Sequence, residues 1–95
     1  MLYSSAKRIH GYGFVCYVKA NDLAIARLGV VIANRNQKLA VYRNQFRRIV
    51  RESFRHHQKL LGGLDIIIVA RKEINSLSKA DLRQEIDRKL EKLKR

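Results

Sequence analysis

The sequence predicts an α+β fold, a small α/β sandwich in which helices pack on one face of a sheet. Three observations support it. Residues 12–19 show a period of two with aromatic and β-branched side chains, residues 39–61 repeat at helical spacing, and residues 64–70 are almost all apolar. Ninety-five residues allow one domain, which we expect to span residues 12–95.

The N-terminal half predicts two strands. Residues 1–11 are short, polar and basic without clear periodicity, so we expect a poorly ordered basic N-terminal segment. A strand over 12–19 follows, with Phe14 on the core face, and residues 20–22 have the composition of a turn. Residues 27–33 form a second apolar run, rich in Val and Ile, which also predicts a strand.

The C-terminal half predicts a helix, a strand and a second helix. The apolar face of residues 39–61 is interrupted after Leu61 by Gly62 and Gly63, which would end a helix in the left-handed region. The run 64–70 is typical of a strand covered on both faces, and residues 71–75 are expected to form a loop. Ser78 is a good N-cap for a last helix. The predicted order is β-β-α-β-α.

The charge balance is far from ordinary. The chain has 21 Lys and Arg against 8 Asp and Glu, a net charge of +13. So strong a field over so small a surface predicts an anionic partner, with nucleic acid first, an anionic membrane second and an acidic protein third.

Other features predict a cytoplasmic protein without a membrane segment. The single cysteine, Cys16, excludes an internal disulfide framework and fits a reducing compartment. The first residues contain no apolar run of the secretory type, and the run 66–70 is far too short to span a bilayer.

The predicted helix 39–61 has a strongly basic face opposite its apolar face. That face gathers Asn44, Arg47, Arg48, Arg51, Arg55 and Lys59, with Arg43 at its border. Only Glu52 opposes these charges, and helical spacing predicts that it pairs with Arg48 or Arg55. A merely solvated face normally mixes signs, so the pattern favours nucleic-acid binding.

The residues offer no convincing catalytic set and no metal site. His57 lies on the apolar helix face, where a partly buried structural histidine is the more frequent case, and no Ser or Cys stands in a nucleophile motif. The carboxylates of Glu52 and Asp65 have no third acid near them in sequence to complete a metal site.

Residues 40–55, AVYRNQFRRIVRESFR, resemble the signature helix of bacterial ribonuclease P protein subunits. The matching positions are Arg43, Asn44, Arg47, Arg48, Arg51, Glu52, Phe54 and Arg55, whereas Gln45 replaces the family's usual Arg. Residues 14–17, 27–33 and 65–72 are similar to the family's strands, so the resemblance covers about residues 12–94. The family's usual N-terminal helix, which carries a Phe and helps form a cleft, has no counterpart, so we expect this chain to lack it.

The resemblance implies a fold like the second domain of ribosomal protein S5. It also implies a left-handed β-α-β crossover through the signature helix. Pattern reasoning alone would predict a right-handed one, because nearly all such crossovers are right-handed.

The resemblance further implies the protein subunit of a ribonucleoprotein that removes 5′ leaders from precursor tRNA. The catalytic RNA would be contacted by Arg35, Arg43, Asn44, Arg47, Arg48, Arg51 and Arg55. Tyr17 would stack on leader bases in a cleft; otherwise it would simply be a strand residue packed under the N-terminal segment. Hydrolysis would rest on Mg²⁺ ions bound mainly by the RNA, so the protein alone should not cleave. The expected partners are the catalytic RNA and precursor tRNA, with no obligate protein partner.

Three other readings of the residues stay open. A ribosomal-type or double-stranded-RNA-binding structural protein would share the charge. A self-sufficient nuclease would cleave precursor tRNA without RNA, and a DNA-binding architectural protein would bind duplex DNA as well as structured RNA.

Overall fold

The computed structural model describes residues 7–33, 35 and 37–93. In chain order the elements are β1 (Lys7–Gly11), β2 (Phe14–Ala20), β3 (Arg27–Val31), α1 (Ala40–His57), the 3₁₀ turn η2 (Gln58–Leu61), β4 (Leu64–Ala70), the 3₁₀ turn η3 (Lys72–Ser76) and α2 (Lys79–Lys92).

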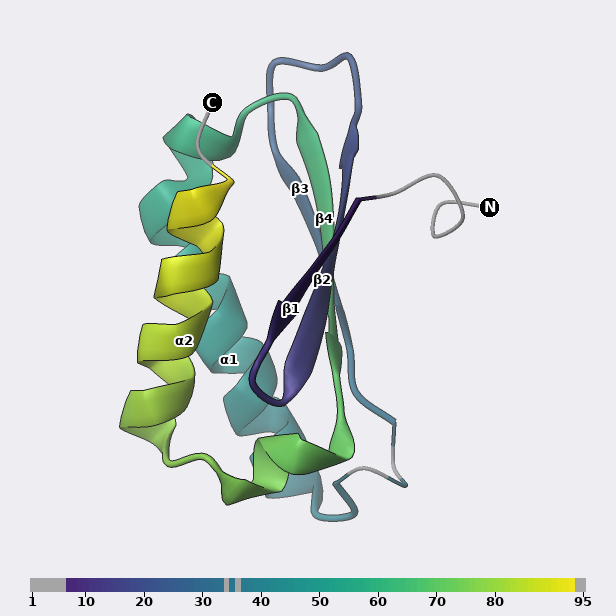
Figure 1. The fold of residues 1–95 in the computed structure, drawn as a ribbon, viewed down its shortest axis with the longest axis vertical. Coiled ribbons are helices and arrows are strands. Elements are labelled where there is room, and N and C mark those ends of the chain that lie inside the picture. Colours follow the sequence, from purple (N-terminus) through teal and green to yellow (C-terminus); the bar gives the residue numbers. More distant parts are fainter. Residues whose placement is uncertain (1–6, 34, 36, 94–95) are drawn as a thin grey trace.

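The four strands form one sheet in the order β1-β2-β4-β3. The pairs β1–β2 and β2–β4 are antiparallel, whereas β3 and β4 are parallel. Both α-helices lie on the same face of this sheet (Figure 1). The predicted α/β sandwich is therefore confirmed.

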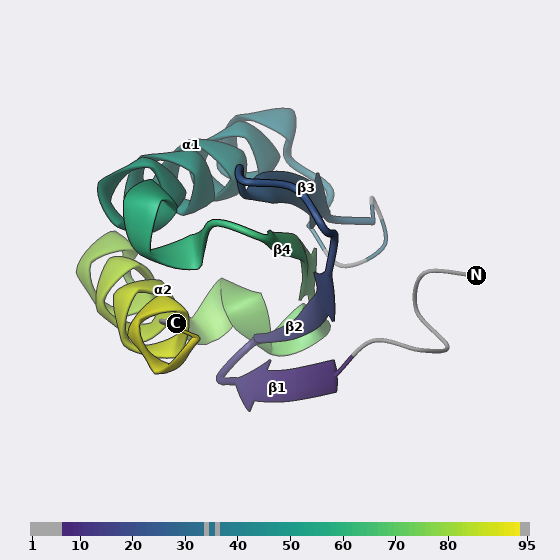
Figure 2. The ribbon, with the colours of Figure 1, turned by 90° about the horizontal axis from the view of Figure 1, so that it is seen from above.

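The crossover from β3 through α1 to β4 is left-handed. Both strands run from the top to the bottom of Figure 1. The helix α1, which follows β3 and precedes β4 in the chain, runs back from the bottom to the top. Seen from above, with the strands running away from the viewer, the chain turns anticlockwise from β3 through α1 to β4 (Figure 2). This is the hand that the family resemblance implies, and it is opposite to the hand favoured by general statistics.

The core lies between the sheet and the two helices. Alternate residues of β2 and β4 face it, and Phe14, Cys16, Ile66 and Ile68 are all completely buried. Burial raises the pKa of the Cys16 thiol to about 12, so this cysteine is a packing residue with little thiolate. Phe14 is a core residue, as predicted.

The prediction that residues 1–11 are poorly ordered is wrong for residues 7–11, which form β1. This strand contains one large apolar residue, Ile9, which packs against the core while its neighbours are exposed. Its order depends on pairing with β2, and a pattern of one apolar residue could not reveal that pairing. Gly13 lies in the turn that connects β1 to β2. Its φ of 83° is in the left-handed region, which glycine adopts without strain. Residues 1–6 lie outside the described residues.

Other boundaries also differ from those expected. The strand expected over residues 12–19 is β2, Phe14–Ala20. The α-helix ends at His57, and residues 58–61 continue as the tighter η2, instead of one helix over 39–61. Strand β3 ends at Val31, and part of the expected loop 71–75 is η3. Ser78 caps α2 as predicted, since its side chain accepts a hydrogen bond from the Asp81 amide at 3.1 Å.

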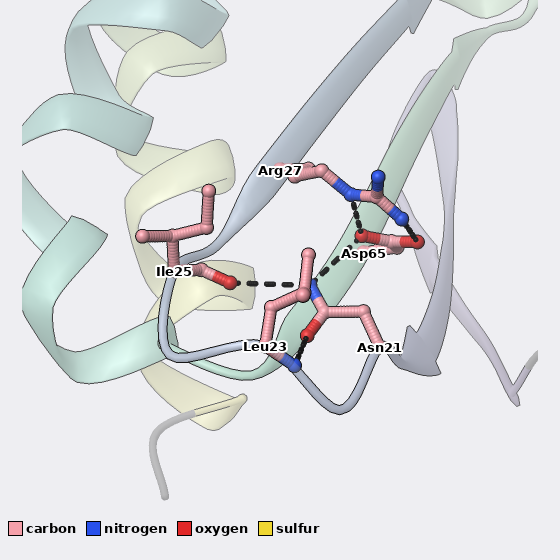
Figure 3. A network of polar contacts seen from close by, with 5 residues as sticks. All are labelled: Asn21, Leu23, Ile25, Arg27 and Asp65. Carbon is pink, nitrogen blue, oxygen red and sulfur yellow. Dashed lines mark hydrogen bonds and ion pairs between the residues drawn. The ribbon is translucent and has the colours of Figure 1, made fainter.

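An ion pair on the sheet face away from the helices joins β3 to β4. Arg27 donates from Nε and Nη2 to the two carboxylate oxygens of Asp65, each at 2.7 Å (Figure 3). Asn21 also donates to Asp65, at 2.9 Å, and to the Ile25 carbonyl, at 3.1 Å, so the same carboxylate anchors the loop between β2 and β3. Chiefly because of the Arg27 hydrogen bonds, the pKa of Asp65 is lowered to about 2.

We expect Asp65→Asn to reduce the free energy of unfolding by about 1 kcal/mol at neutral pH, since Arg27 is largely exposed and water screens the pair. The carboxylate is favoured in the folded state, so its contribution is present above pH 4 and is lost as the pH falls towards 2. Urea denaturation at pH 7 and at low pH measures this difference. The control is Asp22→Asn, which makes the same change of charge in the same loop. Equal urea midpoints for the two variants at pH 7 would contradict the assigned role.

Candidate nucleic-acid interface

The outer face of α1 carries a row of cationic side chains, which we call the arginine strip: Arg47, Arg48, Arg51 and Arg55. Together with Asn44 and Glu52 they line one shallow hollow on the surface. Arg48, Arg51 and Arg55 are exposed and Arg47 is half-buried. The structure thus brings together five of the residues predicted to contact RNA.

The charge of the arginine strip is not neutralised by protein carboxylates. Glu52 was predicted to pair with Arg48 or Arg55, and this prediction is wrong: its ion pair is with Arg83 of α2, at 3.7 Å. Within residues 7–33, 35 and 37–93, no acidic side chain forms an ion pair with an arginine of the strip. Like charges at helical spacing repel one another, so an anionic partner would relieve this repulsion.

The opposite face of α1 holds the strip in place. Phe46, Ile49, Val50, Ser53 and Phe54 are buried on it. Ser53 donates a hydrogen bond from its hydroxyl to the Asp87 carboxylate of α2, and Nδ1 of His57 lies 2.8 Å from the Ser53 carbonyl oxygen. His57 is therefore a hydrogen-bonded, half-buried residue, as predicted.

Arg43 and Arg35 lie apart from the arginine strip. Nη1 of Arg43 donates to the carbonyl oxygens of Gln37 and Lys38, at 2.9 and 2.8 Å. Arg43 thereby holds the segment that leads into α1, a role that its place in the sequence did not reveal. Arg35 is exposed in the connection between β3 and α1.

The sequence model described as Ribonuclease P matches residues 1–94. The chain belongs to this family. The ribonuclease P protein component of Pseudomonas aeruginosa strain PAO1 is 39% identical over 92 residues, which cover 97% of this chain and 68% of that protein.

Solved ribonuclease P proteins share the fold. The Staphylococcus aureus protein superposes with a TM-score of 0.87 at 25% identity, over 99% of this chain and 88% of that one. The Thermotoga maritima protein superposes with a TM-score of 0.82 at 28% identity, over 94% and 87% of the two chains. These matches confirm the family resemblance inferred from residues 40–55.

Tyr17 lies on the sheet face that points away from the helices. It is half-buried, and its cross-strand neighbours are Arg8 in β1 and Ile67 in β4. Gly29 of β3 is the next residue in the same row, so Ile67 has no side chain beside it on that strand. Tyr17 and the arginine strip therefore belong to different surfaces.

Arg83 and the Arg27–Asp65 pair were not predicted from the sequence, because both depend on contacts between distant segments.

The described residues contain no group of three His, Cys, Asp or Glu side chains that could hold a metal ion. The binding of Mg²⁺ mainly by the RNA stays a prediction. Among the described helices, none is long and apolar enough to cross a membrane.

Proposed function

We propose that this chain is the protein subunit of a ribonuclease P ribonucleoprotein and that it binds the catalytic RNA through the outer face of α1. The observation that carries the proposal is the arginine strip, whose charges have no carboxylate partner among the described residues. Membership of the Ribonuclease P family supports the same conclusion.

The chemistry of the strip suits an RNA backbone. Each guanidinium can donate two parallel hydrogen bonds to a phosphate, and each phosphate contact releases counterions into solution. Asn44, in the same hollow, adds a neutral donor and acceptor for a ribose hydroxyl or a base. The protein would thus reduce repulsion between catalytic RNA and substrate, while Mg²⁺ bound by the RNA would supply the hydrolytic chemistry.

A binding assay tests the proposal and separates it from the open alternatives. We expect the chain to bind a bacterial ribonuclease P RNA more tightly than double-stranded RNA or duplex DNA of similar length. Arg47→Ala should weaken binding and reduce the slope of log affinity against log salt by about one, because one phosphate contact is lost. The control is Arg88→Ala on α2, where Arg88 is paired with Glu85. Equal affinity for all three nucleic acids, or equal slopes for the two variants, would contradict the proposal.

The proposal extends to the 5′ leader of precursor tRNA, which would contact the sheet face around Tyr17. Tyr17→Ala should weaken holoenzyme binding to precursor tRNA by roughly 1–3 kcal/mol and leave binding to mature tRNA unchanged, because one stacked base is lost. Tyr17→Phe keeps the ring and should bind like the parent chain. An equal loss for both tRNAs would argue against leader contact at this position.

A further inference from the structure

A half-open pocket is lined by residues from the first half of α1, from η3 and from the start of α2. These segments lie at the lower end of the ribbon in Figure 1. Its volume is about 80 Å³. The floor is apolar and includes the buried side chains of Phe46, Ile49 and Leu82. The floor thus offers an apolar surface at the edge of the core.

The rim of the pocket combines an aromatic ring with polar side chains. Tyr42 lines the pocket although 49% of it is exposed, a large fraction for an aromatic residue beside the core. Gln45 is half-buried, and its side-chain amide has no hydrogen-bond partner within the described part of the chain. The amide of Gln37, also on the rim, instead donates to Asn75. Among the described residues no buried side-chain N or O atom lacks a partner, so the Gln45 amide reaches solvent and can exchange hydrogen bonds with a ligand at the rim.

The pocket borders the arginine strip. Gln45 and Arg48 are three residues apart on α1, so they are neighbours on the helix surface. Lys79, at the start of α2, is exposed on the far side of the pocket. An RNA whose phosphates lie on the strip would therefore carry its next nucleotides past the mouth of the pocket.

We propose that this pocket takes one unpaired nucleobase of the RNA that the arginine strip binds. The ring of Tyr42 stacks on the base, the Gln45 amide exchanges hydrogen bonds with its edge, and Lys79 meets a neighbouring phosphate. A base matches the site because it has an apolar face for the floor and a polar edge for the amide. The cationic surroundings favour RNA over an apolar peptide. The inference rests on the proposed function and adds a specific site to it.

Two variants of Tyr42 test the inference, one by its affinity for a bacterial ribonuclease P RNA and one by its fluorescence when that RNA is bound. Tyr42→Ala should weaken binding about tenfold and leave the salt slope unchanged, since a stacked base but no phosphate contact is lost. The chain contains no Trp, so Tyr42→Trp introduces a single reporter. This variant should bind like the parent chain, and its emission should be quenched at saturating RNA. The control Val41→Ala removes an exposed apolar side chain that does not line the pocket, and it should bind normally.

The inference is overturned if Tyr42→Ala binds like Val41→Ala or if the Tyr42→Trp emission stays constant at saturating RNA. Equal urea midpoints for Tyr42→Ala and the parent chain would show that a loss of affinity is not a loss of fold. Arg47→Ala, measured with the same RNA, separates the two proposals. If Arg47→Ala weakens binding and the Tyr42 variants do not, only the base pocket fails. If Arg47→Ala also has no effect, the proposed RNA-binding surface fails.

Discussion

Replacing Arg47, Arg51 and Arg55 together with Gln should weaken binding to the catalytic RNA roughly a hundredfold at moderate salt. The slope of log affinity against log salt should fall by about three, because each arginine is expected to release counterions at one phosphate. Glutamine keeps much of the side-chain length and a polar end, so the change is mainly one of charge. Filter binding over a series of salt concentrations measures both quantities.

A matched triple variant separates this surface effect from overall charge. Replacing Lys7, Arg88 and Lys92 with Gln also removes three charges, and all three side chains are exposed on β1 or α2. We expect a much smaller loss of affinity, because long-range attraction is screened beyond about 10 Å at moderate salt. Equal losses for the two triple variants would mean that the chain binds RNA by net charge alone.

Phe54→Ala should reduce the free energy of unfolding by about 3 kcal/mol, because it leaves a cavity between α1 and the core. Phe54 is 9% exposed and belongs to the buried face of α1. For a small domain such a loss is a large share of the total stability. The melting temperature should therefore fall by roughly 10 °C or more. Urea and thermal denaturation measure it.

The adjacent residue provides the control for this change. Arg55→Ala should alter stability by less than about 0.5 kcal/mol, since Arg55 is exposed and has no ion pair with a described acidic residue. These two results together would show that the buried face of α1 stabilises the fold, whereas the exposed face is available to bind RNA. A stable Phe54→Ala variant would contradict this division of the helix.

Much of the fold was predictable because its signals are local. The period of two in β2, the apolar run of β4 and the N-cap at Ser78 each depend on a few consecutive residues. The strand β1 was missed because Ile9 is ordered by pairing with β2, a tertiary effect. The hand of the crossover came from the family resemblance, since local patterns do not encode it.

The candidate site divides in the same way. The arginine strip follows from helical spacing alone, so its clustering was predictable. The partner of Glu52 was not, because Arg83 lies 31 positions along the chain on another helix. The sequence also placed Arg43 at the border of the basic face, but only the folded structure shows it bound to the carbonyl groups of Gln37 and Lys38.

Reconstitution tests the central claim most directly. The chain would be mixed with a bacterial ribonuclease P RNA and assayed for cleavage of precursor tRNA at low Mg²⁺, beside the chain alone and the RNA alone. We predict that the parent chain restores cleavage, that the triple variant of Arg47, Arg51 and Arg55 does not at the same concentration, and that the chain alone cleaves nothing. Cleavage by the chain alone, or equal stimulation by the parent chain and the triple variant, would contradict the account.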